Sequence, residues 1–402
     1  MDVSDRQITS FTTLGHALFH TYELSIPLFI GLWITEFGLS AALACLVVGA
    51  GYALVGIGAP ASGVLADYFG SRGLILLSVL GMGGGFALLG AARGPLSLAA
   101  CVVLWGAFAS LYHPAGLSLI SRGASERGTV FAYHGAGGNI GTAVGPLCTA
   151  LLLSVFHWRV TAVVLFVPAA VAAFVGMRIP FDDIETDEND NPDSLGSAFT
   201  DMLVDSRRLF TVGFGIAFVA VLLYGTYYRG LLTFLPDILG NSSLDDLTVL
   251  SYSLGPAEYI YTSMLTFGIA GQYAGGKLTD RIPSRTAFLG ALSSLVVLAL
   301  LFVLVQGQGL VPLVLVSLAL GFFVYATAPI YQVVIAEHVP SESHGLSYGY
   351  TYLAMFGIGA VGATIAGTLL TYATTTALFI ALATLAATGC LCLVVLRWLS
   401  SA

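Results

Sequence analysis

The sequence GVLADYFGSR (63–72) has a partial copy, GKLTDRIPSR (276–285), 213 residues further along the chain. Glycine, leucine, aspartate, serine and arginine occupy the same places in both segments. Each segment follows one long apolar stretch and precedes another. A similarity at a fixed offset indicates that the chain contains two related halves.

Composition places these halves in a membrane. Hydrophobic residues make up 57% of the 402 residues and charged residues only 9%. A soluble domain needs more charge than this to cover its surface. The apolar stretches have the length of about 20 residues that a helix needs to cross ~30 Å of hydrocarbon, and the short alternating segments typical of a β-barrel are not visible. The sequence therefore predicts an all-α membrane protein.

Glycine, proline and charged residues divide the chain into twelve predicted spans. In the first half they lie at 9–34, 41–65, 74–92, 96–120, 128–156 and 160–178. In the second half they lie at 209–236, 255–277, 286–306, 311–336, 346–372 and 377–397.

Basic residues concentrate on one side of these spans. If both termini are cytoplasmic, the cytoplasmic side holds Arg6, Arg72, Arg122, Arg127, Arg178, Arg207, Arg208, Lys277, Arg281, Arg285 and Arg397. Only Arg93 and Arg159 then lie outside, and Arg229 lies within a span. This asymmetry follows the positive-inside rule. We therefore expect a multi-pass protein of the cell membrane with cytoplasmic termini.

The long segment between the two sets of six spans is acidic. Seven acidic residues lie between Asp182 and Asp193, with too few apolar residues to form a core. We predict a six-helix bundle at 1–178, an acidic cytoplasmic linker at 179–208 and a second six-helix bundle at 209–402.

The duplicated loop motif, the twelve spans and the long central loop together resemble the major facilitator superfamily over essentially the whole chain. This resemblance implies two bundles with a substrate site between them, working by alternating access. In that family the aspartate and arginine of the motif form a cytoplasmic latch between the halves. The resemblance assigns this gate to Gly63, Asp67, Gly70, Arg72, Gly276, Asp280 and Arg285. The alternative is that these charges only mark a loop boundary.

A second resemblance covers predicted helices 4 and 5. The segments LYHPAG (111–116) and GGNIGTAVGP (137–146) are similar to fosmidomycin-resistance-like exporters, and the Gly-x-x-x-Gly-Pro end is similar to the helix 5 motif of antiporters. Alanine or threonine stands where further glycines are expected. Gly137, Gly141 and Gly145 lie one turn apart and allow close helix packing, while Pro146 adds a bend. Packing alone would explain these residues, but the resemblance favours antiport.

Ionisable side chains within the predicted first span are the leading candidates for function. His16, His20 and Glu23 follow at i, i+4 and i+7, which places them on one helix face. Such residues are costly in a membrane and usually face a cavity. Imidazoles beside a carboxylate can store or relay a proton, so we expect Glu23 to carry it. The alternative is a fixed polar contact between helices.

Arg229 is the arginine that we place inside a span. A fixed positive charge in a cavity suits a carboxylate or phosphonate, although the side chain could instead extend to the membrane surface or pair with Glu258. Further candidates for the substrate or proton pathway are Tyr22, His113, His134, Asn139, Tyr224, Tyr227, Tyr228, Tyr325, Tyr331, Gln332, Tyr348 and Tyr352.

The sequence contains no phosphate loop with lysine, no nucleophile elbow and no paired metal ligands in a loop. We therefore expect no catalysis, no cofactor and no metal, and transport driven by ion gradients. The expected partners are a small-molecule substrate, protons and the lipid bilayer; we expect a monomer that binds no nucleic acid. The leading function is proton-coupled efflux of a drug or an anionic metabolite. The alternatives are uptake or exchange of an organic anion such as a carboxylate, and a receptor that does not cycle.

Overall fold

The computed structural model describes residues 1–180, 194–240, 244–249, 252–279, 281–339 and 344–399. The first part of the chain forms α1 (Val3–Phe37), α2 (Ala41–Ile57), α3 (Ala59–Phe69), α4 (Ser71–Leu89), α5 (Pro95–Ala109), α6 (Tyr112–Gly123), α7 (Arg127–Leu153), α8 (Trp158–Val164) and α9 (Phe166–Arg178). The second part forms α10 (Leu195–Leu209), α11 (Val212–Gly240), α12 (Pro256–Thr279), α13 (Ser284–Val305), α14 (Leu310–Ala336), α15 (His344–Tyr352), α16 (Val361–Tyr372) and α17 (Thr375–Leu399).

These helices confirm the predicted all-α membrane fold. Among the described residues, ten helices are long and apolar enough to cross a membrane, with α5–α6, α8–α9 and α15–α16 each counted as one. The pair α2–α3 forms one more span, bent by 43°. The helix α12 lies at the remaining predicted span. Its 24 residues reach about 36 Å at 1.5 Å per residue, but Glu258, Gln272 and Lys277 make it more polar than the others.

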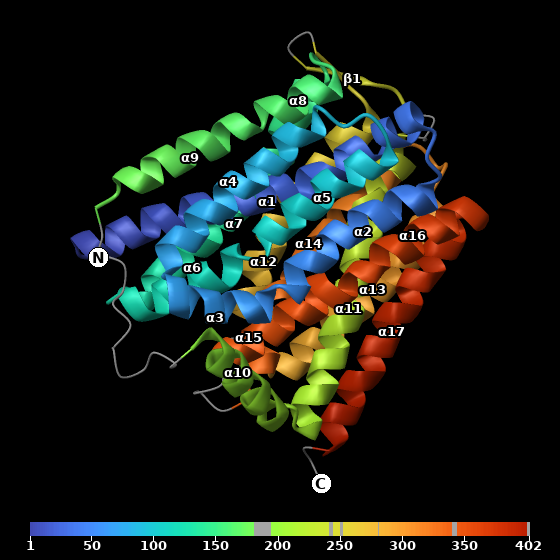
Figure 1. Ribbon diagram of the computed structural model, residues 1–402. Coiled ribbons are helices and arrows are strands. Elements are labelled where there is room, and N and C mark those ends of the chain that lie inside the picture. The colour runs from blue at the N-terminus through green and yellow to red at the C-terminus, as the bar shows by residue number, and fades with distance from the viewer. Residues whose placement is uncertain (181–193, 241–243, 250–251, 280, 340–343, 400–402) are drawn as a thin grey trace.

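The two long helices α1 and α11 converge at one end of the molecule and separate toward the other. Figure 1 shows them close together on the side that bears β1 and spread apart toward the N- and C-terminal ends. Both ends of the chain, marked N and C in Figure 1, lie on the side where the two helices have separated, which we call the terminal side. The helix α2 packs against α16, and α7 packs against α12, so contacts between the two parts of the chain flank this opening.

Glycines let α7 lie directly on the backbone of α1. A β-carbon added at Gly137 would meet Thr13, one at Gly141 would collide with the carbonyl of Ala17, and one at Gly145 would meet Thr21. Three glycines at intervals of four residues thus form one smooth helix face. The outer surfaces of the bundle are apolar, as expected for contact with lipid; exposed examples are Val171, Leu304 and Trp398.

The span that contains α15 and α16 is interrupted between them. A π-helical turn (Leu353–Gly357) and a 3-10 turn (Ile358–Ala360) join the two helices. Gly56 of α2 lies so close to this turn that an added β-carbon would collide with the backbone nitrogen of Gly357. Single π-turns inside α-helices often occur at functional sites.

The first loop motif ends α3 with a left-handed residue. Gly70 has φ 84°, which a residue with a β-carbon rarely adopts; proline replaces it in the second copy. Arg72 donates to the carbonyls of Gly176, Met177 and Ile179, so it stabilises the C-terminal end of α9. The side chain of Asp67 and all of Asp280 lie outside the described residues, and the latch stays a prediction.

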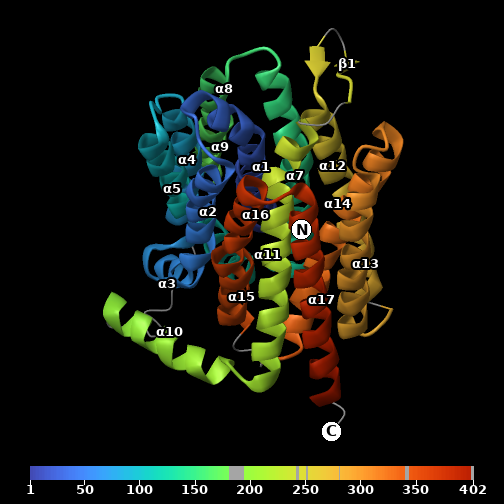
Figure 2. The same ribbon diagram turned by 90° about the vertical axis from the view of Figure 1, so that its right-hand side faces the viewer.

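Two elements within or next to loops were not expected. The helix α10 occupies residues of the predicted linker, and Figure 2 shows it running crosswise to the spans before α11. Its N-cap Ser194 accepts from the backbone of Ser197. Between α11 and α12, β1 (Leu247–Val249) pairs antiparallel with β2 (Tyr252–Leu254), with Leu247 opposite Leu254.

The contact between α1 and α7 predicts that alanine substitutions at two glycines will change the melting temperature by different amounts. Gly141→Ala should lower the melting temperature of the purified protein by several degrees, because overpacking a close contact costs about 1–3 kcal/mol. Gly84→Ala in α4 is the control, since a β-carbon there meets nothing within 4 Å. Equal melting temperatures for the two variants would contradict the packing described here.

Candidate functional site

A buried ion pair joins the two parts of the chain. The guanidinium of Arg229 in α11 donates to Glu23 Oε1 in α1, and their side chains are 1% and 0% exposed. Arg229 therefore neither extends to the membrane surface nor pairs with Glu258. Its guanidinium carbon lies 3.8 Å from the ring centre of Tyr52, whose hydroxyl donates to the backbone carbonyl of Glu23. A cation over an aromatic face is stabilised when it is removed from water.

Two histidines extend this ion pair into a chain of hydrogen bonds. Glu23 Oε2 lies 2.7 Å from His20 Nδ1, and His20 Nε2 lies 3.2 Å from His16 Nε2. His16 Nδ1 lies 2.7 Å from the carbonyl oxygen of His134. The helical spacing of His16, His20 and Glu23 brings them together on one face of α1, and α7 supplies the carbonyl at the end of the chain.

Counting hydrogens shows that all three links of this chain can be hydrogen-bonded at once only if the chain carries one added proton. Its three links, from the carbonyl of His134 to His16, to His20 and to Glu23, each need one hydrogen. Two neutral imidazoles supply one hydrogen each, and an ionised carboxylate supplies none. The third hydrogen is therefore an added proton, held by His16, His20 or Glu23. Without it, one of the three links must open.

Further aromatic groups surround the histidines. The ring of His134 is stacked on His16 with their centres 4.0 Å apart, and the centre of His113 in α6 lies 5.1 Å from that of His16. On the other side, the hydroxyl of Tyr352 in α15 is 3.3 Å from His113 Nδ1. The cluster thus receives residues from α1, α6 and α7, and α15 covers it.

A cavity lies beside this cluster, between the two parts of the chain. Its volume is about 110 Å³, which is smaller than most sites for small molecules. The lining comprises His16, His20, His113, Gly135, Gly138, Asn139, Thr142, Tyr224, Tyr228, Gln272, Tyr325, Ala328, Tyr331, Gln332, Tyr352, Met355 and Phe356. One wall therefore carries histidines and the other carries tyrosines.

Glu23 and Arg229 do not line the cavity themselves; they lie next to its lining residue His20, farther from the termini. Glu23 and Arg229 both come after the midpoints of α1 and α11, which begin on the terminal side. The lining residues Gly135, Ala328 and Gln332 lie in the parts of α7 and α14 nearest that side, and Gln332 is exposed. The two long helices also separate in this direction (Figure 1). The exposed side chain of Gln332 thus places the solvent-facing part of the cavity lining toward the terminal side.

Three of the tyrosines predicted from the sequence do not line this cavity. The hydroxyl of Tyr22 donates to the carbonyl of Leu165 and that of Tyr227 to the carbonyl of Leu295, so both are fixed within the helix packing. Tyr348 is half-buried and is not part of the lining.

The sequence analysis also missed several residues of the ion pair's surroundings and of the cavity. Gln272 is a polar residue in the middle of a predicted span, so it could have been found. Tyr52 sits in an apolar helix with no sign of its contact with Arg229. Met355 and Phe356 lie in the π-helical turn and line the cavity. The sequence does not predict this turn.

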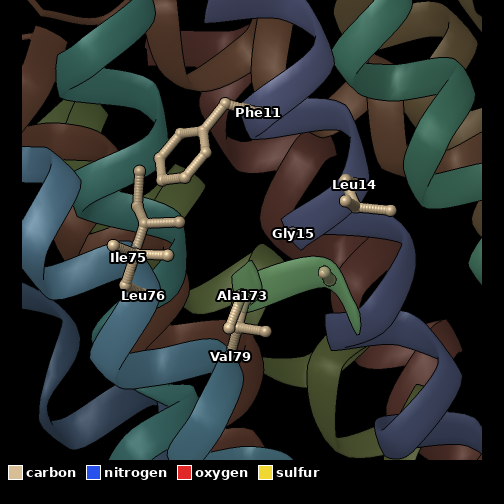
Figure 3. Close-up of a pocket in the computed structure, with 8 residues that line it drawn as sticks. Phe11, Leu14, Gly15, Ile75, Leu76, Val79 and Ala173 are labelled. Atoms are coloured by element: carbon tan, nitrogen blue, oxygen red, sulfur yellow. The ribbon is translucent and has the colours of Figure 1, made fainter. Parts of the chain in front are cut away.

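A smaller cavity lies within the first part of the chain. Figure 3 shows Phe11 and Leu14 of α1 facing Ile75 and Val79 of α4 and Ala173 of α9. All eight residues that line it are apolar. We regard it as a packing gap, because it offers no side-chain group that could orient a polar molecule.

Comparison with known proteins identifies the fold. The family model of the Major Facilitator Superfamily matches residues 12–359 and, in a second match, residues 217–402. The chain belongs to this superfamily. Superfamily membership and the long apolar helices establish it as a multi-pass membrane transporter.

Two relatives and one solved structure show how similar the chain is to individual proteins. The MFS-type transporter YfnC of Bacillus subtilis is 26% identical over 317 residues, which cover 76% of this chain and 72% of that protein. The puromycin resistance protein pur8 of Streptomyces alboniger is 37% identical over 120 residues, but this match spans only 29% of the chain and 24% of that protein. The crystal structure of the nucleoside transporter NupG has a TM-score of 0.76 at 13% identity, covering 98% of this chain and 100% of that one.

The buried ion pair predicts a non-additive effect on stability. Arg229→Met should lower the melting temperature, because it removes one partner of a buried pair, a change that costs about 3–5 kcal/mol. Since His20 still contacts Glu23, we expect a loss at the lower end of this range. Adding Glu23→Gln should restore part of the loss. Arg208→Met, in an exposed pair with Asp205, is the control and should melt like the unchanged protein. A double variant with the sum of both losses would contradict the pairing.

Proposed function

We propose that the protein is a proton-coupled secondary transporter of a small organic anion, with the bundles at 1–178 and 209–402 moving against each other by alternating access. One observation carries this proposal. The carboxylate of Glu23 is shared between a histidine chain that needs one added proton to be fully hydrogen-bonded and the guanidinium of Arg229. Proton binding and the availability of a buried positive charge are therefore linked through one side chain.

In this proposal, binding of the proton and binding of the anion favour each other. While Glu23 is ionised, it neutralises Arg229, and an anionic cargo would have to compete with it. When the added proton resides on Glu23, Arg229 has lost its counter-charge and can accept the anionic group of a cargo. Arg229 Nε has no hydrogen-bond partner among the described residues, so a donor remains available. The proton and the anion thus strengthen each other's binding, and by linkage the effect is reciprocal.

Histidine and tyrosine side chains from the surrounding helices face the histidine chain and Arg229. The chain on α1 faces His113 of α6, His134 of α7 and Tyr352 of α15. Arg229 faces Tyr52 of α2 and Tyr228 of its own helix. Of these groups, the histidines and Glu23 belong to the residue types that commonly carry protons in catalysis and transport, so we expect pH to act on transport through this cluster.

The direction of transport follows from the joint binding of proton and anion. Two ligands that favour the same state cross the membrane together, so an inward proton gradient would drive uptake. If the termini are cytoplasmic, as the basic residues predict, the cavity described here opens to the cytoplasm. The carrier would then be in the state that releases its cargo. The cargo is small and carries at least one polar group that the cavity tyrosines can bind.

Export is the second candidate function. The helix 5 motif favours antiport, and the match to the puromycin resistance protein suggests a drug as cargo. In that case a cationic cargo would displace Arg229 from Glu23, and a proton would compete with the cargo. The two candidates therefore predict opposite effects of pH: acidification raises the affinity for a symported anion and lowers the affinity for an exported cation.

The experiment is transport in proteoliposomes with a cargo found by thermal-shift screening of carboxylates, phosphonates and cationic antibiotics. Glu23→Gln should abolish accumulation driven by a pH gradient while leaving exchange of labelled for unlabelled cargo, because glutamine keeps the shape but binds no proton. Glu258→Gln is the matched control and should retain both activities. Intact pH-driven accumulation in Glu23→Gln would refute the assignment. A cargo affinity that falls on acidification would favour export over uptake.

A further inference from the structure

The histidines offer a second chemistry beside proton transfer. One ring nitrogen from each of His16, His113 and His134 lies within 4.8 Å of the other two. The three residues come from α1, α6 and α7, and His113 and His134 are only 3% and 4% exposed. Three convergent imidazoles in a site removed from water are the donor set of many metal centres.

Two of these histidines have ring nitrogens that the protein leaves unused. His113 Nε2 and His134 Nε2 are buried and have no hydrogen-bond partner among the described residues. Buried polar atoms are normally bonded, and an unbonded pair next to a third imidazole calls for a ligand. A carboxylate would suit calcium or magnesium, but an all-nitrogen set selects zinc, copper, nickel or cobalt.

We propose that His16, His113 and His134 bind one divalent transition-metal ion, with Zn²⁺ as the best-fitting example. Zinc takes nitrogen ligands at about 2.0–2.1 Å in a tetrahedron, and three protein ligands leave its fourth position to another molecule. His16 and His113 line the cavity, so that position is accessible from it. This site does not depend on the identity of the transported cargo.

Binding requires a small rearrangement of one ring. A metal lies in the plane of each imidazole that holds it, whereas the rings of His16 and His134 are stacked with only 9° between their planes. One of them must therefore turn. His16 also bonds His134 through Nδ1 and His20 through Nε2, so it must release one of these partners to become a ligand. The metal and the complete hydrogen-bonded chain exclude each other.

This exclusion links the metal to the proton. Ligating histidines must be neutral, and the positive charge of Arg229 together with the added proton on the chain repels a cation. Zinc affinity should therefore rise with pH. A bound ion also breaks one of the two hydrogen bonds of His16, to His20 or to the carbonyl of His134, so it should inhibit any transport that uses the chain.

The sequence did not predict this site, because its proposed ligands follow no short motif. His16, His113 and His134 are far apart in the chain and meet only because α7 lies directly on α1 and α6 packs beside them. Loop motifs with closely spaced ligands, which sequence analysis looks for, are not involved.

The test is metal binding by the purified full-length protein, prepared without a histidine tag. Co²⁺ serves as the spectroscopic probe, and Zn²⁺ competition measures the affinity. We expect one Co²⁺ per chain with the intense visible absorption of tetrahedral coordination. His113→Ala and His134→Ala should each weaken binding by at least about tenfold, since even changes outside the ligand set cost about 10–100-fold. His157→Ala, whose side chain is 59% exposed, is the control and should bind like the unchanged protein.

The pH dependence gives an independent measurement that does not rely on a variant. Zinc should bind more tightly at pH 8 than at pH 6 and release protons into a weakly buffered solution. No stoichiometric binding, octahedral cobalt spectra, or equal affinities in His134→Ala and His157→Ala would overturn the proposal. A zinc indicator inside proteoliposomes then separates two supporting outcomes: a carried ion accumulates, and a resident ion does not. Loss of pH coupling in Glu23→Gln without any metal binding would reject this site and leave the proposed function intact.

Discussion

The ion pair between Glu23 and Arg229 is the contact on which the arrangement of the molecule depends. It joins α1 to α11, the first helices of the two predicted bundles, next to the cavity but outside its lining. Removing two charges from water is costly, so evolution would not retain this pair for stability alone. The surrounding groups explain its presence: Tyr52 covers the guanidinium, and His20 takes the second carboxylate oxygen. In the transport cycle that we propose, the charge state of Glu23 would therefore control a contact between the two parts of the chain.

Much of the fold could be predicted from the sequence, because a membrane imposes simple rules on a chain. Apolar segments of sufficient length must be helices, and the repeated loop motif indicated two related halves before any helix was placed. The rules also explain what was missed. The helix α10 is amphipathic and lies outside the spans, so hydropathy does not reveal it. The strands β1 and β2 are only three residues long, and the π-helical turn in the span of α15 and α16 depends on packing against Gly56.

The candidate site was predicted in part, and physical reasons explain which residues were predicted correctly and which were not. His16, His20 and Glu23 share one face of one helix, so their spacing alone brings them together. That Arg229 would meet Glu23, rather than Glu258 or the membrane surface, depends on how α11 packs against α1. Tyr22 and Tyr227 were equally plausible candidates by residue type, but each hydroxyl is held by a backbone carbonyl inside the helix packing. A single sequence shows which residues are polar and cannot show which way they face across a bundle.

The cavity has a histidine wall from the first part of the chain and a tyrosine wall from the second. In the transport cycle that we propose, this division would separate the source of energy from the choice of cargo. Substitutions among Tyr224, Tyr228, Tyr325 and Tyr331 can reshape the space offered to a molecule without touching the groups that hold the proton. A lineage of such carriers can therefore acquire new nutrients or toxins by changing one wall while inheriting the other, and a protein engineer can follow the same route.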